Sequence, residues 1–218
     1  TGSHGILVRD DSSFNLIGGT GAGEGNVIAN SGDDGVRVGD TADANAIVGN
    51  SITASGGLGI DLFGPGGPNA NDGTGDPDTG PNELQNYPEL TGAVTGTSTF
   101  VGGRLDSEES TSYRIEVFAN STADASGYGE GETFLGAFTV TTDANGEAQF
   151  GAALAGIAAA GDSIVATATE LGPAGQLQST SEFSESVTEG CDNAPTSGAD
   201  LVTGTAGDDV LCGSGGND

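Results

Sequence analysis

The residues best suited to chemistry are glycines and aspartates that recur at fixed spacing near the C-terminus. Residues 204–218 read GTAGDDVLC followed by GSGGND. Both stretches approach the nine-residue pattern G-G-x-G-x-D-x-U-x, although Thr205 and Ser214 replace its second glycine. Aspartate carboxylates and backbone carbonyls are the oxygen ligands that Ca²⁺ prefers. The spacing predicts calcium binding here, and a plain Gly/Asp linker is the alternative.

A second group of oxygen-bearing side chains lies in the middle of the chain. It consists of Asp72, Asp76, Asp78 and Asn82, set among glycines and prolines. The group resembles the first half of a calcium loop, but the closing Glu and flanking helices of an EF-hand are missing. We expect calcium here as well, and a series of Asx-rich turns is the alternative.

Catalytic constellations are scarce. Arg37 and Asp61 are the one base-and-carboxylate pair that suits a polysaccharide lyase, and a salt bridge explains them equally well. Acid pairs drawn from Asp10, Asp11, Asp33 and Asp34 lie in turn-like stretches where solvated aspartate is common. His4 is the only histidine. The sequence therefore predicts that the chain is not an enzyme.

The charge balance limits the partners. The 218 residues include four Arg, no Lys and 32 acidic residues, for a formal net charge of −28. Binding to nucleic acid or to anionic membranes needs the basic residues that are missing here. No apolar run approaches the roughly 20 residues of a membrane span. The charge favours cations, calcium first, and solubility in a salty medium is the alternative reading.

Short apolar phrases repeat in the first third of the chain. Ile6, Val36 and Ile60 recur at matching places in glycine-led phrases, and further phrases led by Asn recur in the same order. Because side chains alternate along a strand, we expect these three residues to stack inward. The same register predicts that Arg37 and Asp61 are stacked neighbours on the outer face.

These repeats, with their Ile-Gly-Gly-Thr and Gly-Asn-Val-Ile phrases, resemble the right-handed parallel β-helix of large bacterial surface and secreted proteins. The resemblance implies an all-β fold with β-helix coils over residues 1–87, ending in the acidic stretch. Seven β-rich runs between Leu90 and Val187 predict an immunoglobulin-like β-sandwich over 88–188.

The glycine-rich end, residues 189–218, resembles the RTX (repeats-in-toxin, hemolysin-type) calcium-binding repeat, here as a truncated β-roll. Carried over by position, the side-chain ligands are Asp209 and Asp218. The implied carbonyl ligands are those of Gly204, Ala206, Gly213 and Gly215.

Cys191 and Cys212 are the only cysteines. An extracellular setting favours a disulfide between them, and two free thiols are the alternative. The sequence thus predicts a calcium-stabilised structural or adhesive module of a secreted or cell-surface protein. Other copies of the chain, joined into extracellular fibres, and glycans are the expected partners besides Ca²⁺. A carbohydrate-active or glycan-binding fragment is the alternative function.

Overall fold

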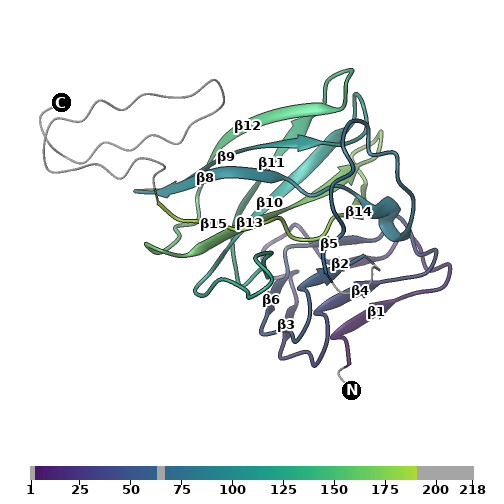
Figure 1. Ribbon diagram of the computed structural model, residues 1–218, viewed down its shortest axis with the longest axis horizontal. Helices are drawn as coiled ribbons and strands as arrows, with labels where there is room; N and C mark the ends of the chain where they lie inside the picture. The colour runs from purple at the N-terminus through teal and green to yellow at the C-terminus, as the bar shows by residue number, and fades with distance from the viewer. Residues whose placement is uncertain (1–2, 63–66, 191–218) are drawn as a thin grey trace, which may run out of the picture.

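The computed structural model describes residues 3–62 and 67–190. Every regular element in these ranges is a β-strand, except the short 3-10 helix η1 (Pro81–Leu84). The all-β prediction is therefore confirmed. Figure 1 shows short N-terminal strands lying beside two larger sheets. In the described ranges, no helix has the length and apolar character needed to span a membrane.

The first third of the chain forms three small parallel sheets. One contains β1 (Ile6–Val8), β4 (Val36–Val38) and β7 (Ile60–Asp61); the second contains β2 (Leu16–Gly18) and β5 (Ala46–Val48); the third contains β3 (Val27–Ala29) and β6 (Ser51–Thr53). Ile6 is opposite Val36, and Val36 is opposite Ile60. The predicted stacking of these residues is confirmed.

Asparagine side chains join equivalent turns. The Oδ1 atom of Asn45 accepts hydrogen bonds from the backbone N–H and the Nδ2 group of Asn15, at 3.2 and 2.8 Å. Asn50 Oδ1 accepts the same two bonds from Asn26, both at 3.0 Å. The recurrent asparagines thus satisfy backbone groups just before the strands begin.

Two antiparallel sheets follow. The first has the order β12–β9–β8, from β8 (Glu89–Thr95), β9 (Thr99–Asp106) and β12 (Glu147–Leu154). The second has the order β11–β10–β13–β14, from β10 (Ser112–Asn120), β11 (Thr133–Thr141), β13 (Ser163–Leu171) and β14 (Leu177–Thr180), and β15 (Val187–Thr188) also pairs with β13. Residues of both sheets share one apolar core, which includes Val101, Leu105, Tyr113, Ile115 and Ile164.

Carboxylates of the antiparallel part close one edge of the parallel sheets. Glu116 Oε2 accepts the backbone N–H of Gly49 at 2.7 Å. The two carboxylate oxygens of Glu130 accept the N–H groups of Ala54 and Ser55, at 2.6 and 2.7 Å. An open edge would leave these donors unpaired. These side chains bind the turns that follow β5 and β6, while β6 itself pairs through the backbone of Ile52 with Gly131.

The predicted resemblance to β-helix repeat proteins with an immunoglobulin-like sandwich and an RTX repeat is wrong. In the described residues each parallel sheet has only two or three strands, no sheet closes or continues as a solenoid, and the long strands are antiparallel. A solenoid needs at least three stacked repeats to bury a continuous core. Here the full set of three strands occurs twice, and Phe118, Val165 and Phe183 from the antiparallel part complete the apolar cluster of the parallel strands.

The close stacking of turns predicts a large effect at Gly25. A Cβ atom at Gly25 would lie 1.9 Å from the carbonyl oxygen of Gly49, which is rigid backbone. We expect Gly25→Ala to lower the free energy of unfolding by about 1–3 kcal/mol, the usual cost of overpacking. Gly96→Ala is the control, because a Cβ there meets nothing within 4 Å. Equal urea midpoints for the two variants would contradict the stacking.

Candidate metal centre

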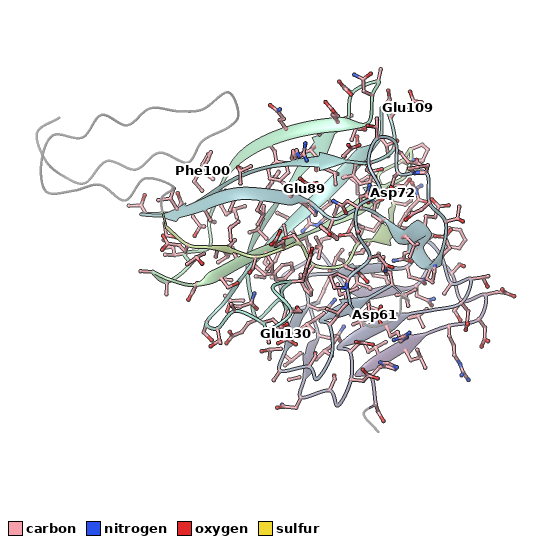
Figure 2. All side chains as sticks on the ribbon, viewed as in Figure 1. Asp61, Asp72, Glu89, Phe100, Glu109 and Glu130 are labelled. Atoms are coloured by element: carbon pink, nitrogen blue, oxygen red, sulfur yellow. The ribbon has the colours of Figure 1, made fainter. Side chains whose placement is uncertain are left out.

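Three aspartates of the segment between β7 and η1 lie together. One carboxylate oxygen from each of Asp72, Asp76 and Asp78 falls within 4.8 Å of the other two. Gly73 and Gly75 have φ angles of 96° and 85°, and Asp76 has φ 48°. These left-handed residues turn the segment so that its carboxylates converge. Figure 2 shows Asp72 on this segment, beside the antiparallel strands.

Hydrogen bonds hold the Asp76 side chain in place. Its Oδ2 atom accepts the hydroxyl of Ser107 at 2.7 Å, the backbone N–H of Asn86 at 3.1 Å and the Nε2 group of Gln85 at 3.2 Å. Ser107 Oγ also lies 2.9 Å from the hydroxyl of Tyr113, which is fully buried. The carboxylate of Asp76 is thus fixed by the stretch after η1 and by Ser107, the residue after β9, which in turn contacts Tyr113 of β10.

Two further oxygens of the cluster have no such partners among the described residues. Asp76 Oδ1 and Asp78 Oδ1 are buried, and among the described residues neither has a hydrogen-bond partner. Buried carboxylate oxygens are costly to leave unpaired, so each such atom needs an explanation. A cation held between them supplies one.

The electrostatics point the same way. Burial above all, together with the negative charges of Asp78 and Asp72, raises the pKa of Asp76 to about 6. Burial and the charge of Asp72 also raise the pKa of Asp78. Both shifts mean that the ionised cluster is disfavoured as it stands, and a bound cation would relieve this.

The donor set fits calcium. Ca²⁺ lies about 2.3–2.6 Å from its oxygen ligands, so two ligands of one ion are at most about 5 Å apart. The spacing of 4.8 Å or less satisfies this limit. Among the described residues the cluster contains no nitrogen or sulfur ligand, and an all-oxygen donor set favours a hard cation over zinc. Carbonyls or water would have to complete the six to eight ligands of Ca²⁺.

Asn82 is not brought to this cluster. Its Oδ1 atom accepts the backbone N–H of Asn45 at 3.0 Å, and its Nδ2 group donates to the carbonyls of Asn45 and Thr180. The side chain is completely buried between the parallel strands and β14. Its role in the described structure is to join those two elements.

Sequence reasoning missed the residues that support the cluster. Gln85, Asn86 and Ser107 contact Asp76 from 9 to 31 residues away, and no local spacing signals them. A second acidic group was also missed, formed by His4, Asp33 and Asp34. Asp34 there already accepts hydrogen bonds from Arg37 and from the N–H of Leu58, so its oxygens are engaged.

The remaining predicted ligands lie outside the described residues. They are Gly204, Ala206, Asp209, Gly213, Gly215 and Asp218, and the two cysteines, Cys191 and Cys212, lie there too. No family model matches the sequence, and no curated protein matches it either. The comparisons therefore give no support to an RTX repeat or to β-helix kinship.

Proposed function

We propose that this chain is a calcium-stabilised structural module of a secreted or cell-surface protein. The observation that carries the proposal is the cluster of Asp72, Asp76 and Asp78, in which two buried carboxylate oxygens have no hydrogen-bond partner among the described residues. A site with three carboxylates on a surface segment suits the high calcium concentrations found outside cells.

The position of the cluster explains what calcium would do. The segment that carries it leads from the parallel strands to β8, and Asp76 is tied to β9 through Ser107. A cation there would fix this connection against both antiparallel sheets. Its effect would be mechanical and thermodynamic, because it binds the folded arrangement and not the unfolded chain.

Association with other copies of the chain is the adhesive part of the proposal. The outer strands of the parallel sheets expose Leu16 and Val27, at 57 % and 80 %, and the nearby turn exposes Phe14 at 81 %. On the opposite side, Glu116 and Glu130 bind the turns after β5 and β6, and Gly131 pairs with β6. Among the described residues, β1, β2 and β3 each pair with a strand on one side alone, so the N-terminal edge offers strands for association.

The test is thermal unfolding at pH 7 in calcium and in EDTA. For the unaltered chain, calcium at about 100 times its Kd would add about 2.7 kcal/mol, or several degrees in Tm. In Asp76→Asn with Asp78→Asn, we expect this gain to disappear. The same variant should be at least as stable as the unaltered chain in EDTA, since it removes two carboxylates whose pKa values are raised.

The matched control removes two charges elsewhere, by Glu109→Gln with Glu147→Gln, both at exposed positions. This control should keep the full calcium gain. If the Tm of the unaltered chain is the same in calcium and in EDTA, the proposal is refuted. An equal loss of the gain in the control would show that calcium only screens the net charge.

A further inference from the structure

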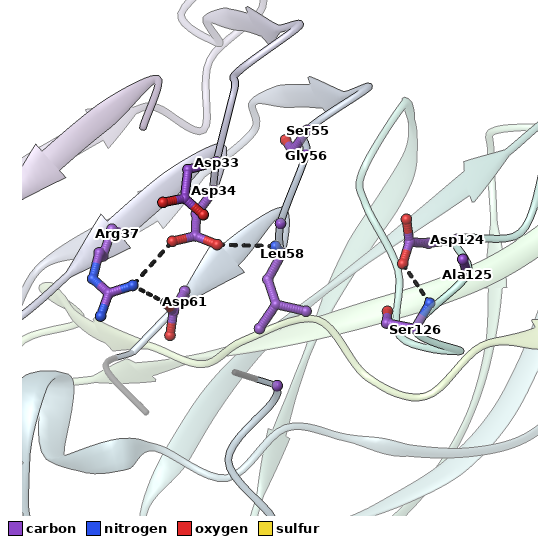
Figure 3. A pocket seen from close by; sticks show the side chains of 12 residues that line it. Asp33, Asp34, Arg37, Ser55, Gly56, Leu58, Asp61, Asp124, Ala125 and Ser126 are labelled. Atoms are coloured by element: carbon purple, nitrogen blue, oxygen red, sulfur yellow. Dashed lines mark hydrogen bonds and ion pairs between the residues drawn. The ribbon is translucent and has the colours of Figure 1, made fainter. Parts of the chain in front are cut away.

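A pocket separate from the calcium cluster opens between the two parts of the chain. It has a volume of about 410 Å³. One wall comes from the turns before β4 and before β7, with Asp33 and Asp34, and from Asp61 in β7 itself. The other wall is Asp124 to Ser126, in the loop between β10 and β11 (Figure 3).

The pocket is strongly acidic for its size. Its lining contains the carboxylates of Asp33, Asp34, Asp61 and Asp124, and the guanidinium of Arg37 is its one formal positive charge. The sequence has no Lys and only three other Arg residues. These three pair with acidic residues elsewhere, namely Arg9 with Asp10, Arg104 with Glu89, and Arg114 with Glu116. A ligand that balances the pocket must therefore bring its own positive charge.

The inner wall is preorganised. Arg37 Nη1 lies 2.6 Å from Asp61 Oδ2 and 3.2 Å from Asp34 Oδ2, and the side chains of both aspartates are more than nine-tenths buried. Asp34 Oδ1 accepts the backbone N–H of Leu58 at 3.0 Å. A Cβ atom at Gly57 would lie 2.3 Å from Asp34 Oδ1, so glycine is needed for this contact. The charged groups at the base hold fixed positions, as a binding site requires.

The rim carries groups that are less engaged. The Asp33 side chain is half exposed, and its Oδ2 atom lies 3.9 Å from Nδ1 of His4, which is 3.0 Å from Asp34 Oδ2. Asp124 Oδ1 accepts the backbone N–H of Ser126 at 2.8 Å, and Asp124 remains partly exposed. Ser55 also lines the pocket, and its hydroxyl is buried without a hydrogen-bond partner among the described residues. The rim thus offers acceptors from both parts of the chain.

We propose that this pocket binds a small organic cation through a primary alkylammonium group. The volume lies within the range of about 300–1,000 Å³ for small-molecule sites and exceeds what a bare metal ion needs. An ammonium has three N–H donors, which match the carboxylates and hydroxyls of the walls. This site and the calcium cluster share no residue, and neither proposal depends on the other.

The test is isothermal titration of the full chain, in calcium-saturated buffer, with butane-1,4-diamine. The uncharged isostere butane-1,4-diol and glucose are the comparison titrants. We expect binding of the diamine only. Asp33→Asn with Asp124→Asn should weaken it at least about tenfold, because two rim carboxylates are lost and the buried base is left intact.

Glu109→Gln with Glu147→Gln is again the control with the same loss of charge, and should bind the diamine as the unaltered chain does. Figure 2 shows Glu109 far from Asp61. Amide NMR shifts on addition of the diamine should centre on Leu58 and Ser126. Nα-acetyl-lysine amide is a further titrant that tests the source of the ammonium group. If it binds at least as tightly as the diamine, the natural ligand is a lysine side chain. If it binds more weakly, the natural ligand is a free diamine.

Three outcomes would overturn the proposal. They are equal binding of diol and diamine, equal weakening in the control variant, and shifts centred on residues 72–78 instead of the pocket.

Discussion

Replacing Glu182 by Gln is expected to flatten the pH dependence of stability between about pH 4.5 and pH 7. Glu182 is 2 % exposed, and its burial raises the pKa from 4.5 to about 7. The folded chain therefore holds a proton on this group at pH values where the unfolded chain has released it. Stability from this group is complete below the unfolded pKa and is lost as the pH rises through the folded pKa.

The size of the effect follows from the shift. One pKa unit corresponds to 1.36 kcal/mol. Ionisation of Glu182 alone should therefore lower the free energy of unfolding by roughly 3 kcal/mol as the pH rises from about 4.5 to above 7. Its carboxylate nevertheless accepts the backbone N–H groups of Leu62 and Asn69, at 2.9 and 2.7 Å, and the Nδ2 group of Asn69 at 3.0 Å. These bonds lower the pKa, and the nearby charge of Asp61 raises it, so the net rise reflects burial above all.

Urea unfolding at several pH values measures this directly. The difference in unfolding free energy between Glu182→Gln and the unaltered chain should grow in favour of Gln as the pH rises from 4.5 to 7. Glu109→Gln, at an exposed position, should leave the profile unchanged. Parallel profiles for Glu182→Gln and the unaltered chain would show that Glu182 ionises alike in both states.

The sequence predicted the local pattern well, because that pattern is set by near neighbours. The alternation of Ile6, Leu7 and Val8 and its recurrence at Val36 determined the register of the parallel strands. The seven β-rich runs between residues 90 and 187 all overlap observed strands. Asp72, Asp76 and Asp78 converge because they lie within seven residues of one another on a glycine-rich turn.

The contacts between distant segments could not be predicted in this way. Glu116 and Gly49 are 67 residues apart, and Glu182 and Leu62 are 120 residues apart. Nothing in the local pattern shows that the side chain of a distant glutamate will accept a backbone N–H group in the turn after a parallel strand. Asn82 illustrates the same limit, because its spacing from Asp78 suggested a ligand while Asn45 and Thr180 hold it elsewhere.

The last of the seven β-rich runs in the sequence spans Thr180 to Val187, and it shows how a strand signal can mislead about boundaries. The structure ends β14 at Thr180 and begins β15 at Val187. Between them, the hydroxyls of Ser181 and Ser184 accept the backbone N–H groups of Ala168 and Ala166, at 2.9 and 3.0 Å. The serine hydroxyls accept N–H groups that backbone carbonyls would accept in a regular strand. Glu182 lies between the two serines, and its side chain contacts Leu62 of the parallel part.

Removing the charge of Arg37 should destabilise the chain most of all the changes considered. The sequence predicted that Arg37 and Asp61 are stacked neighbours, and the pairing is confirmed by their strand register and by a contact of 2.6 Å. The expectation that both lie on the outer face is wrong for Asp61, whose side chain is 7 % exposed. Arg37 also contacts Asp34, which is 6 % exposed, so one guanidinium faces two buried carboxylates.

Arg37→Ala would leave both carboxylates buried without that guanidinium. Breaking a buried ion pair by removing one partner typically costs about 3–5 kcal/mol, because the other charge stays desolvated. We therefore expect a loss of that size in urea unfolding at pH 7. Arg104→Ala is the matched control, since Arg104 and its partner Glu89 are 59 % and 44 % exposed, and exposed pairs contribute at most about 1 kcal/mol.

A second variant separates the charge from the packing of the side chain. Asp61→Asn in the Arg37→Ala background removes one of the stranded charges and should recover part of the loss. If Arg37→Ala and Arg104→Ala prove equally mild, the carboxylates of Asp34 and Asp61 are solvated in the folded chain. The pocket base would then be flexible rather than fixed by the ion pairs, and the acidic wall would lack the support that Arg37 gives it.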